Sequence, residues 1–357
     1  MKLSLIYYPD DPIEDALAIV RLAEELGFYA CYMTDFPYRK DVWGFLAAAA
    51  RATHSIRLGP NTARVLHRDP VLCAQALATL DELSNGRVEA LIGAGGDLPN
   101  QARPLMESEQ KTRRIGRLKE ADAVMRLFFE RDTFVFDGEF YQYRYRDMRF
   151  SARPVQSRIS IGWGTMGGPL ITTVAAQMAD GVHVGPAKSR HLCRYIVERV
   201  KRGATRAGRD WTDLDIGVCP VWCCSPDAEA ARAVARIQTA FYLPIMAPNV
   251  LPTCGIDPDS VAAICAAWER GDLDEAVNLV SDDMMNVLAI AGTPEDCLKQ
   301  VKENILGTGV NHLVLMVTDA FHTELISNRW VRGVPNIEGQ LKLLSSTILP
   351  ELLALTP

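Results

Sequence analysis

Residues 3–33 read LSLIYYPDDPIEDALAIVRLAEELGFYACYM and hold one complete strand–helix–strand unit. The apolar run 3–8 predicts a buried strand, because parallel strands covered on both faces carry near-continuous apolar residues. Residues 12–26 place apolar side chains at helical spacing, with Pro12 in the first turn and a glycine directly after the last residue. Residues 28–33 form the next apolar run. This stretch therefore predicts a parallel βαβ unit.

The same alternation continues along the chain. Further strands are expected near residues 56, 87, 159, 181, 216 and 311. Helices are expected at about 41–53, 70–83, 109–129, 169–179, 188–207, 294–305 and 336–353. With the first two strands this makes eight βα units, which favour an α/β fold closed as a (β/α)8 TIM barrel over an open doubly wound sheet.

Two excursions interrupt the alternation. Residues 132–157 contain a hairpin pattern around Asp137-Gly138, and residues 243–290 look helical. Between them, Ile216 to Cys224 is expected to form one strand. We therefore expect a single barrel domain spanning residues 1–357, with insertions at about 132–157 and 243–290.

Composition excludes several classes of protein. Of the 357 residues, 48% are hydrophobic and 23% are charged, which is ordinary globular usage and excludes a disordered chain. The net charge of −6 and the lack of a basic stripe argue against a nucleic-acid partner. No uncharged apolar run reaches about 18 residues, and the amino-terminal run is too short for a signal peptide. We therefore expect a cytoplasmic protein that does not contact membranes.

The cysteines argue against a metal centre. They number nine, include no Cys-x-x-Cys, and have no matching histidine or cysteine pair at zinc-ligand spacing. We expect reduced, mostly buried thiols and no metal site.

In a (β/α)8 barrel, functional residues follow the carboxyl ends of the strands. The first three strands lead into Tyr7-Tyr8, Thr34-Asp35-Phe36 and Asn61-Thr62-Ala63-Arg64. An acid such as Asp35 can accept a hydrogen bond from a ring N–H, or it can cap the next helix. Arg64, His67 and Arg68 bring positive charge to the third loop, where they either meet a ligand or are solvated.

Two glycine-rich segments follow later strands. Gly93-Ala94-Gly95-Gly96-Asp97 lets the backbone approach a flat ligand, although it lacks the third glycine of a dinucleotide fingerprint. Residues 164–169, Gly-Thr-Met-Gly-Gly-Pro, lead directly into a helix, whose free amides form an anion site. This segment is the best phosphate cradle in the chain, the alternative being a tight strand–helix turn. Lys188 and Arg190 add cations after the sixth strand.

The sequence lacks the motifs of enzymes whose own side chains carry out the chemistry. The chain has no Gly-x-Ser-x-Gly nucleophile elbow, no His-Glu-x-x-His helix and no Walker phosphate-binding pattern. A protein of this kind can take its reactivity from an organic cofactor.

Three stretches resemble the luciferase-like monooxygenase superfamily. They are residues 1–35 with Leu-Ala-Glu-Glu-Leu-Gly-Phe and Thr-Asp, residues 56–87 with Thr-Leu-Asp-Glu-Leu-Ser-Asn-Gly-Arg, and residues 167–181 with Gly-Gly-Pro and Ala-Asp-Gly. Within the superfamily the chain is most similar to the branch that uses the deazaflavin coenzyme F420, and there to methylenetetrahydromethanopterin reductase. The resemblance covers about residues 1–130 and 158–320.

The resemblance implies a barrel that holds a flavin-like ring at the carboxyl ends of its strands. It implies that Asp35 contacts the coenzyme and that a cis peptide between Asn61 and Thr62 backs the ring. The resemblance implies a set of cofactor-binding residues, to which we add the neighbouring cation Arg64. The full set is Asp35, Asn61, Thr62, Arg64, Ala94, Gly95, Gly167, Gly168 and Leu170. Homodimers are common in the family, so we expect one here.

The chain departs from that branch at three places. Phe36 stands where many members have a histidine, so an imidazole cannot donate a proton from there. Gly96 stands where several members have an acid, with Asp97 one place later. Residues 61–66 also differ from the reductase loop.

These residues lead to a hypothesis with two alternatives. We expect an F420-dependent oxidoreductase that passes a hydride between the coenzyme and the C=N, C=C or C=O bond of a small molecule. Candidate proton donors are Asp97, His67, Tyr8 and Tyr7, and candidate pocket walls are Tyr7, Phe36, Trp43 and Trp163. One alternative is an FMN-dependent monooxygenase or reductase on the same fold. The other is a barrel that binds a cofactor without turnover.

Overall fold

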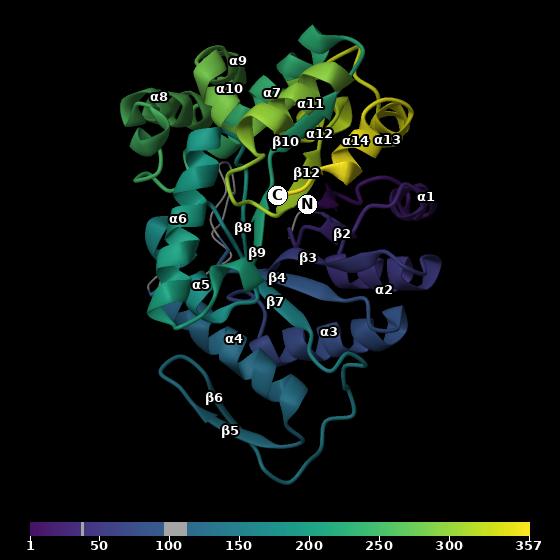
Figure 1. The fold of residues 1–357 in the computed structure, drawn as a ribbon, viewed down its shortest axis with the longest axis vertical. Helices are drawn as coiled ribbons and strands as arrows, with labels where there is room; N and C mark the ends of the chain where they lie inside the picture. Colours follow the sequence, from purple (N-terminus) through teal and green to yellow (C-terminus); the bar gives the residue numbers. More distant parts are fainter. Residues whose placement is uncertain (37–38, 96–112) are drawn as a thin grey trace. The chain divides into compact units, whose positions relative to one another are not determined.

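The computed structural model describes residues 1–36, 39–95 and 113–357. These residues form two compact units (Figure 1). Unit A holds the described residues between 7 and 164, and unit B holds Met1–Ile6 and Thr165–Pro357.

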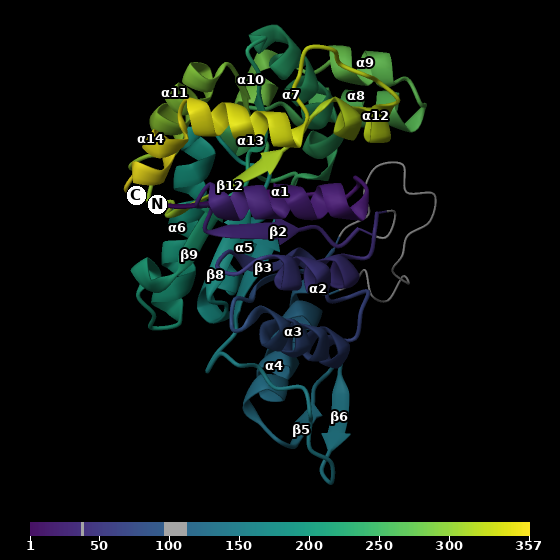
Figure 2. The ribbon, with the colours of Figure 1, turned by 90° about the vertical axis from the view of Figure 1, so that its right-hand side faces the viewer.

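Unit A repeats a strand followed by a helix. Its parallel strands pair in the order β2 (Ala30–Met33), β3 (Arg57–Arg64), β4 (Glu89–Gly93) and β7 (Ser160–Thr165). Its helices are α1 (Ile13–Glu25), α2 (Val42–Ala52), α3 (Pro70–Ser84) and α4 (Arg114–Glu130). Figure 2 shows α1, α2 and α3 side by side in chain order, as repeated βα units place them.

Local chemistry fixes the helix ends in unit A. Asp41 begins α2 by accepting a hydrogen bond from the Gly44 amide. Asp69 begins α3 in the same way, and the helix ends at Asn85, which has a φ of 55°. These ends explain why the sequence predicted both helices to within two residues.

The first insertion is an antiparallel hairpin of β5 (Phe134–Asp137) and β6 (Gln142–Tyr145), as predicted. The Glu120 carboxylate on α4 holds its turn by accepting hydrogen bonds from the amides of residues 139, 140 and 141. The fully buried Asp81 holds the returning chain, because it accepts hydrogen bonds from both amide groups of Gln156 and from the Val155 amide.

Unit B contains the remaining parallel strands. They are β1 (Lys2–Tyr7), β8 (Gly181–Val184), β9 (Asp215–Val218), β10 (Val221–Cys224), β11 (Ala289–Gly292) and β12 (His312–Val317). Strand β12 pairs with β1, β9 and β10, while β8 pairs with β9 and β11 with β10. Every residue of β12 is buried, as expected for a strand covered on both faces.

The helices of unit B cover these strands. They are α5 (Pro169–Met178), α6 (Arg190–Arg206), α7 (Ala228–Tyr242), α8 (Pro258–Glu269), α9 (Leu273–Asn278), α10 (Asp282–Leu288), α11 (Pro294–Asn304), α12 (Ala320–Ser327), α13 (Ile337–Ser346) and α14 (Leu349–Ala354).

Three sequence predictions were wrong in unit B. The strand expected from Ile216 to Cys224 is split into β9 and β10, because Pro220 lies between them and has no N–H for a ladder. The excursion at 243–290 holds the expected helices, α8, α9 and α10, but the expectation was wrong at its end, where the last two residues begin β11. The helix expected at 336–353 is divided into α13 and α14, since Pro350 restarts the helix. Helix α12 was not foreseen.

Residues 109–112 of the helix expected at 109–129 lie outside the described residues, and the rest corresponds to α4. In the described part of the chain, no helix is both long and apolar enough to span a membrane.

Candidate active site

Strand β3 carries a bulge at the position the resemblance implies. The peptide bond between Asn61 and Thr62 is cis. Asn61 pairs with Leu91 and Ala63 pairs with the next residue of β4, so Thr62 is the extra residue. The bulge turns the Thr62 side chain toward β4 and toward β7, the next strand beyond it.

Two glycines make room for that side chain. A Cβ on Gly93 would lie 2.7 Å from Thr62 Oγ1, and a Cβ on Gly164 would lie 2.1 Å from Thr62 Cγ2. Both distances are far below an ordinary contact. The bulge in β3 therefore depends on the glycines at the carboxyl ends of β4 and β7.

In unit A, several buried donors lack a partner among the described residues. These atoms are Asn61 Nδ2, Thr34 Oγ1 and Trp43 Nε1. A donor shielded from water without a hydrogen bond costs about 1–3 kcal/mol. Such atoms mark a place where a polar ligand restores the missing bonds.

Asp35 lies directly after β2 and faces the same bulge. Its Oδ2 accepts a hydrogen bond of 3.4 Å from the Arg64 amide. Partial burial raises the pKa of Asp35, although this hydrogen bond and the charges of Arg68 and Arg64 oppose the rise. Asp35 is therefore an acceptor in a poorly hydrated position, next to the unpartnered donors of unit A.

Gly95 brings the loop after β4 against the loop after β3. It has a φ of 67°, and a Cβ there would lie 2.7 Å from His67 Cε1 and 3.1 Å from Arg64 Nε. Ala94 beside it is 9% exposed and Arg64 is 6% exposed. The structure thus brings four predicted residues together: Arg64, His67, Ala94 and Gly95. The predicted Asp97 lies outside the described residues.

The end of β1 contributes two buried tyrosines. The Tyr7 hydroxyl donates to Asp11 Oδ2 at 2.8 Å, so its proton is already engaged. The Tyr8 ring lies 4.4 Å from the guanidinium of Arg39, which is also paired with Asp10. Arg39 and Asp10 are almost fully buried, with side chains 7% and 11% exposed.

Sequence reasoning did not single out Arg39 or Asp10. The only signal available was that each lies a few residues past a strand end.

The predicted aromatic walls lie in different surroundings. Phe36 is half-buried directly after Asp35. Trp43 is half-buried on α2, with the Arg68 guanidinium 5.5 Å from its ring. Trp163 is fully buried and donates to Asp122 Oδ2 at 2.8 Å, which is the environment of an ordinary core residue.

Unit B presents the predicted phosphate cradle at the start of α5. Gly168 begins the helix without any side-chain cap, which leaves the first-turn amides for a ligand. Gly167 has a φ of 82°, and its amide donates to Thr165 Oγ1 at 3.0 Å. Leu170 is 65% exposed.

The cations after β8 are not all on a solvated face. Lys188 is 3% exposed, and its ammonium makes one long hydrogen bond of 3.4 Å to Asn286 Oδ1. Burial lowers the pKa of Lys188 to about 8. The Arg190 guanidinium donates to the Glu303 and Leu306 carbonyl oxygens, so it serves the packing of α6.

Known proteins resemble this chain along most of its length. A family model described as luciferase-like monooxygenase matches residues 3–312. A 5,10-methylenetetrahydromethanopterin reductase of Methanolobus tindarius is 29% identical over 88% of this chain and 93% of its own. An F420-dependent glucose-6-phosphate dehydrogenase of Amycolatopsis mediterranei is 27% identical over 86% of this chain and 88% of its own.

Among solved structures, the coenzyme F420-dependent tetrahydromethanopterin reductase of Methanopyrus kandleri has a TM-score of 0.81. It is 24% identical and covers 98% of this chain and 99% of its own. This likeness confirms the predicted (β/α)8 barrel fold.

Proposed function

The chain belongs to the luciferase-like monooxygenase family, and from this premise we propose that it is an oxidoreductase that uses coenzyme F420. In this proposal it transfers a hydride between the coenzyme and a small organic substrate. Two of the proteins named above support the coenzyme, because the glucose-6-phosphate dehydrogenase and the tetrahydromethanopterin reductase of known structure are both named as F420-dependent and both resemble the chain over most of its length.

One observation carries the proposal. The buried donors of Asn61 and Thr34 have no partner among the described residues, and the acceptor Asp35 follows Thr34 directly. The pyrimidine edge of a deazaflavin has carbonyl acceptors and an N–H donor, so it complements this set. The bulge at Asn61–Thr62, packed against Gly93 and Gly164, gives the ring a fixed support.

We assign the chain's residues the following work. Asn61, Thr34 and Asp35 orient the coenzyme. Ala94 and Gly95 bring the backbone close to it, and Arg64 supplies a positive charge beside it. In unit B, the amides at Gly168 and Leu170, with the turn at Gly167, are suited to bind a phosphate group. When bound, the reduced coenzyme supplies a hydride for a C=N, C=C or C=O bond. The apolar faces of Tyr7, Tyr8, Phe36 and Trp43 exclude water from the substrate.

A proton donor completes a reduction. His67 is our first candidate, because it lies against Gly95 in the loop next to the bulge. Tyr8 is the second, since it lies at the end of β1 with its ring 4.4 Å from the Arg39 guanidinium. Asp97 remains a candidate from the sequence alone. Tyr7 serves better as a wall, because its hydroxyl proton is held by Asp11.

Binding measurements test the proposal and separate it from the FMN alternative. The purified protein is titrated with F420 and, separately, with FMN, following the fluorescence of each. We expect F420 to bind and FMN to bind much more weakly. Asn61→Ala should weaken F420 binding roughly tenfold, the worth of one hydrogen bond to a buried group. The exposed Asn278→Ala on α9 is the matched control. Tight binding of FMN alone would overturn the proposal.

Three further expectations are also proposals. We propose a cytoplasmic homodimer that acts on a small molecule and binds neither nucleic acid nor membranes. The molar mass of the protein, measured by light scattering as it elutes from a size-exclusion column, tests the dimer. We also propose one domain over residues 1–357 with insertions at about 132–157 and 243–290. A single cooperative unfolding transition, seen alike by fluorescence and circular dichroism, would support it.

A further inference from the structure

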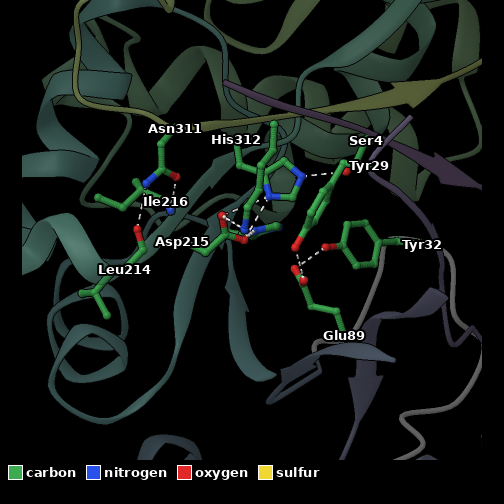
Figure 3. A network of polar contacts seen from close by, with 11 residues as sticks. Ser4, Tyr29, Tyr32, Glu89, Leu214, Asp215, Ile216, Asn311 and His312 are labelled. Carbon is green, nitrogen blue, oxygen red and sulfur yellow. Dashed lines mark hydrogen bonds and ion pairs between the residues drawn. The ribbon is translucent and has the colours of Figure 1, made fainter. Parts of the chain in front are cut away.

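Two imidazoles and a carboxylate converge inside unit B. They belong to His183 on β8, Asp215 on β9 and His312 on β12, and one ligand-type atom from each lies within 4.8 Å of the others. His183 Nε2 and His312 Nδ1 each lie 2.9 Å from Asp215 Oδ2. Figure 3 shows Asp215 and His312 pointing toward one another. None of the three belongs to the active site proposed above.

Strand register creates this convergence. His183 and His312 both pair with Gly217, which lies between them on β9. Asp215 precedes Gly217 by two residues, so its side chain is on the same face of the strand as the missing side chain of the glycine. A Cβ on Gly217 would lie 2.5 Å from His183 Cδ2. Only glycine at this position lets the imidazole lie over the central strand.

The outer sides of the two rings are also held. His312 Nε2 lies 2.7 Å from the hydroxyl of the fully buried Ser4 (Figure 3). The Cys219 thiol lies near the His183 ring, where it can partner the outer nitrogen, Nδ1. Lys2 donates to Asp215 Oδ1 at 3.1 Å, and Oδ2 is the oxygen nearer to His312 Nδ1, at 2.9 Å against 3.2 Å for Oδ1. Metal-binding histidines are held in this way, with the outer nitrogen fixed by a neighbour so that the inner nitrogen faces the ion.

We propose that His183, Asp215 and His312 form a binding site for one divalent transition-metal ion, with Zn²⁺ the best fit. The ligands are His183 Nε2, His312 Nδ1 and Asp215 Oδ2, and water supplies the fourth. Zn²⁺ favours this mixture of nitrogen and oxygen at bond lengths of about 2.0–2.2 Å in a tetrahedron. That geometry separates neighbouring ligand atoms by about 3.3–3.5 Å. Each imidazole nitrogen, now 2.9 Å from Asp215 Oδ2, must therefore move away from it by about half an ångström, and the two nitrogens, up to 4.8 Å apart, must approach each other by up to about 1.4 Å.

Binding of the metal ion displaces protons from the two imidazoles. Each imidazole binds through the nitrogen that now lies against Asp215, so any proton there moves to the outer nitrogen or leaves to solvent. An outer N–H then donates to Ser4 or Cys219. Because an imidazole binds the ion only in its neutral form, the ion competes with protons, and binding is measured at a pH well above the ordinary imidazole pKa of about 6.5.

Metal binding to the whole protein tests the proposal. Chelator-treated protein is titrated with Zn²⁺ by calorimetry and with Co²⁺ by visible absorption. We expect one equivalent per chain and the absorption bands of tetrahedral cobalt without thiolate charge transfer. His312→Gln should weaken binding at least about a hundredfold, because a ligand is lost. His322→Gln is the matched control. Like His312, His322 is buried and hydrogen-bonded to a carboxylate, that of Asp319, but it does not belong to the cluster of His183, Asp215 and His312.

A second variant tests the charge of the site and leaves every ligand in place. Lys2→Met removes an ammonium 3.1 Å from Asp215 Oδ1. Since a cation there repels a metal ion, the variant should bind Zn²⁺ several-fold more tightly. Absence of binding by the unaltered protein would overturn the proposal, as would thiolate charge transfer or unchanged affinity in His312→Gln. If that variant fails to fold, the cobalt spectrum of the unaltered protein and the Lys2→Met titration decide. Either result leaves the proposed hydride transfer untouched.

Discussion

Replacing Gly164 with alanine tests whether the bulge in β3 is the support on which the proposed coenzyme rests. The new Cβ would lie 2.1 Å from Thr62 Cγ2, whereas two carbon atoms pack at about 3.5–4.0 Å. Thr62 or the backbone of β7 must therefore move by about 1.5 Å. Overpacking of this kind costs about 1–3 kcal/mol.

We expect Gly164→Ala to lower the melting temperature by about 2–6 °C and to weaken F420 binding at least tenfold. The loss of binding should exceed what partial unfolding explains, because the bulge that backs the ring is displaced. Urea unfolding and fluorescence titration measure the two effects separately.

Two variants decide whether the collision is the cause. Thr62→Ser removes Cγ2, so adding it to Gly164→Ala should recover part of the stability and binding in a double-mutant cycle. Gly44→Ala is the matched control, because its nearest contact is an ordinary 3.5 Å and it lies within α2. It should be neutral or stabilise by up to about 1 kcal/mol. If Gly164→Ala behaves like Gly44→Ala, or if Thr62→Ser brings no recovery, the reasoning is refuted.

Three further changes probe buried or bound carboxylates. Burial opposes ionisation of Glu24, but hydrogen bonds from the amides of residues 54–56 lower its pKa to about 2. Glu24→Gln should therefore cost about 1–2 kcal/mol at neutral pH, and the difference should vanish as the pH falls from about 4.5 toward 2, as urea unfolding at several pH values will reveal. Burial raises the pKa of Asp35, so its ionisation costs stability as the pH rises through that raised value. Asp35→Asn should leave neutral-pH stability unchanged or higher while weakening F420 binding, and equal affinity would contradict the assignment. Asp81→Ala should lower stability by about 3 kcal/mol or more, because it leaves the Gln156 and Val155 amides unpaired; exposed Glu82→Ala should change little in the same denaturation assay.

Part of the candidate site was predictable because its residues lie at the ends of two apolar runs, although the structure continues β3 through Asn61 and Thr62 to Arg64. Asp35 and the Asn61–Thr62 pair came from their places after two apolar runs and from a family resemblance in the same stretches. Arg39 and Asp10 were missed, because nothing local distinguishes a buried ion pair from two solvated loop residues. Their burial against Tyr8 is known only once the loops after β1 and β2 are placed.

The sequence by itself determined the order and type of most elements. The signals used were apolar runs, helical spacing, capping aspartates and flanking glycines. Each acts over a few residues, so it can be recognised without the tertiary structure. The same local logic failed at Pro220, where an apolar run reads as one strand although the ladder is broken.

Only the tertiary structure decided which distant side chains meet. Gly164 and Thr62 are brought together because β4 pairs with both β3 and β7, and His183 and His312 are brought together by their shared register with Gly217. Asp215 is separated from these histidines by 32 and 97 residues, so no spacing rule for metal ligands detects the cluster. Convergence of this kind depends on strand register, and register is set by the packing of the whole sheet rather than by any short segment of the chain.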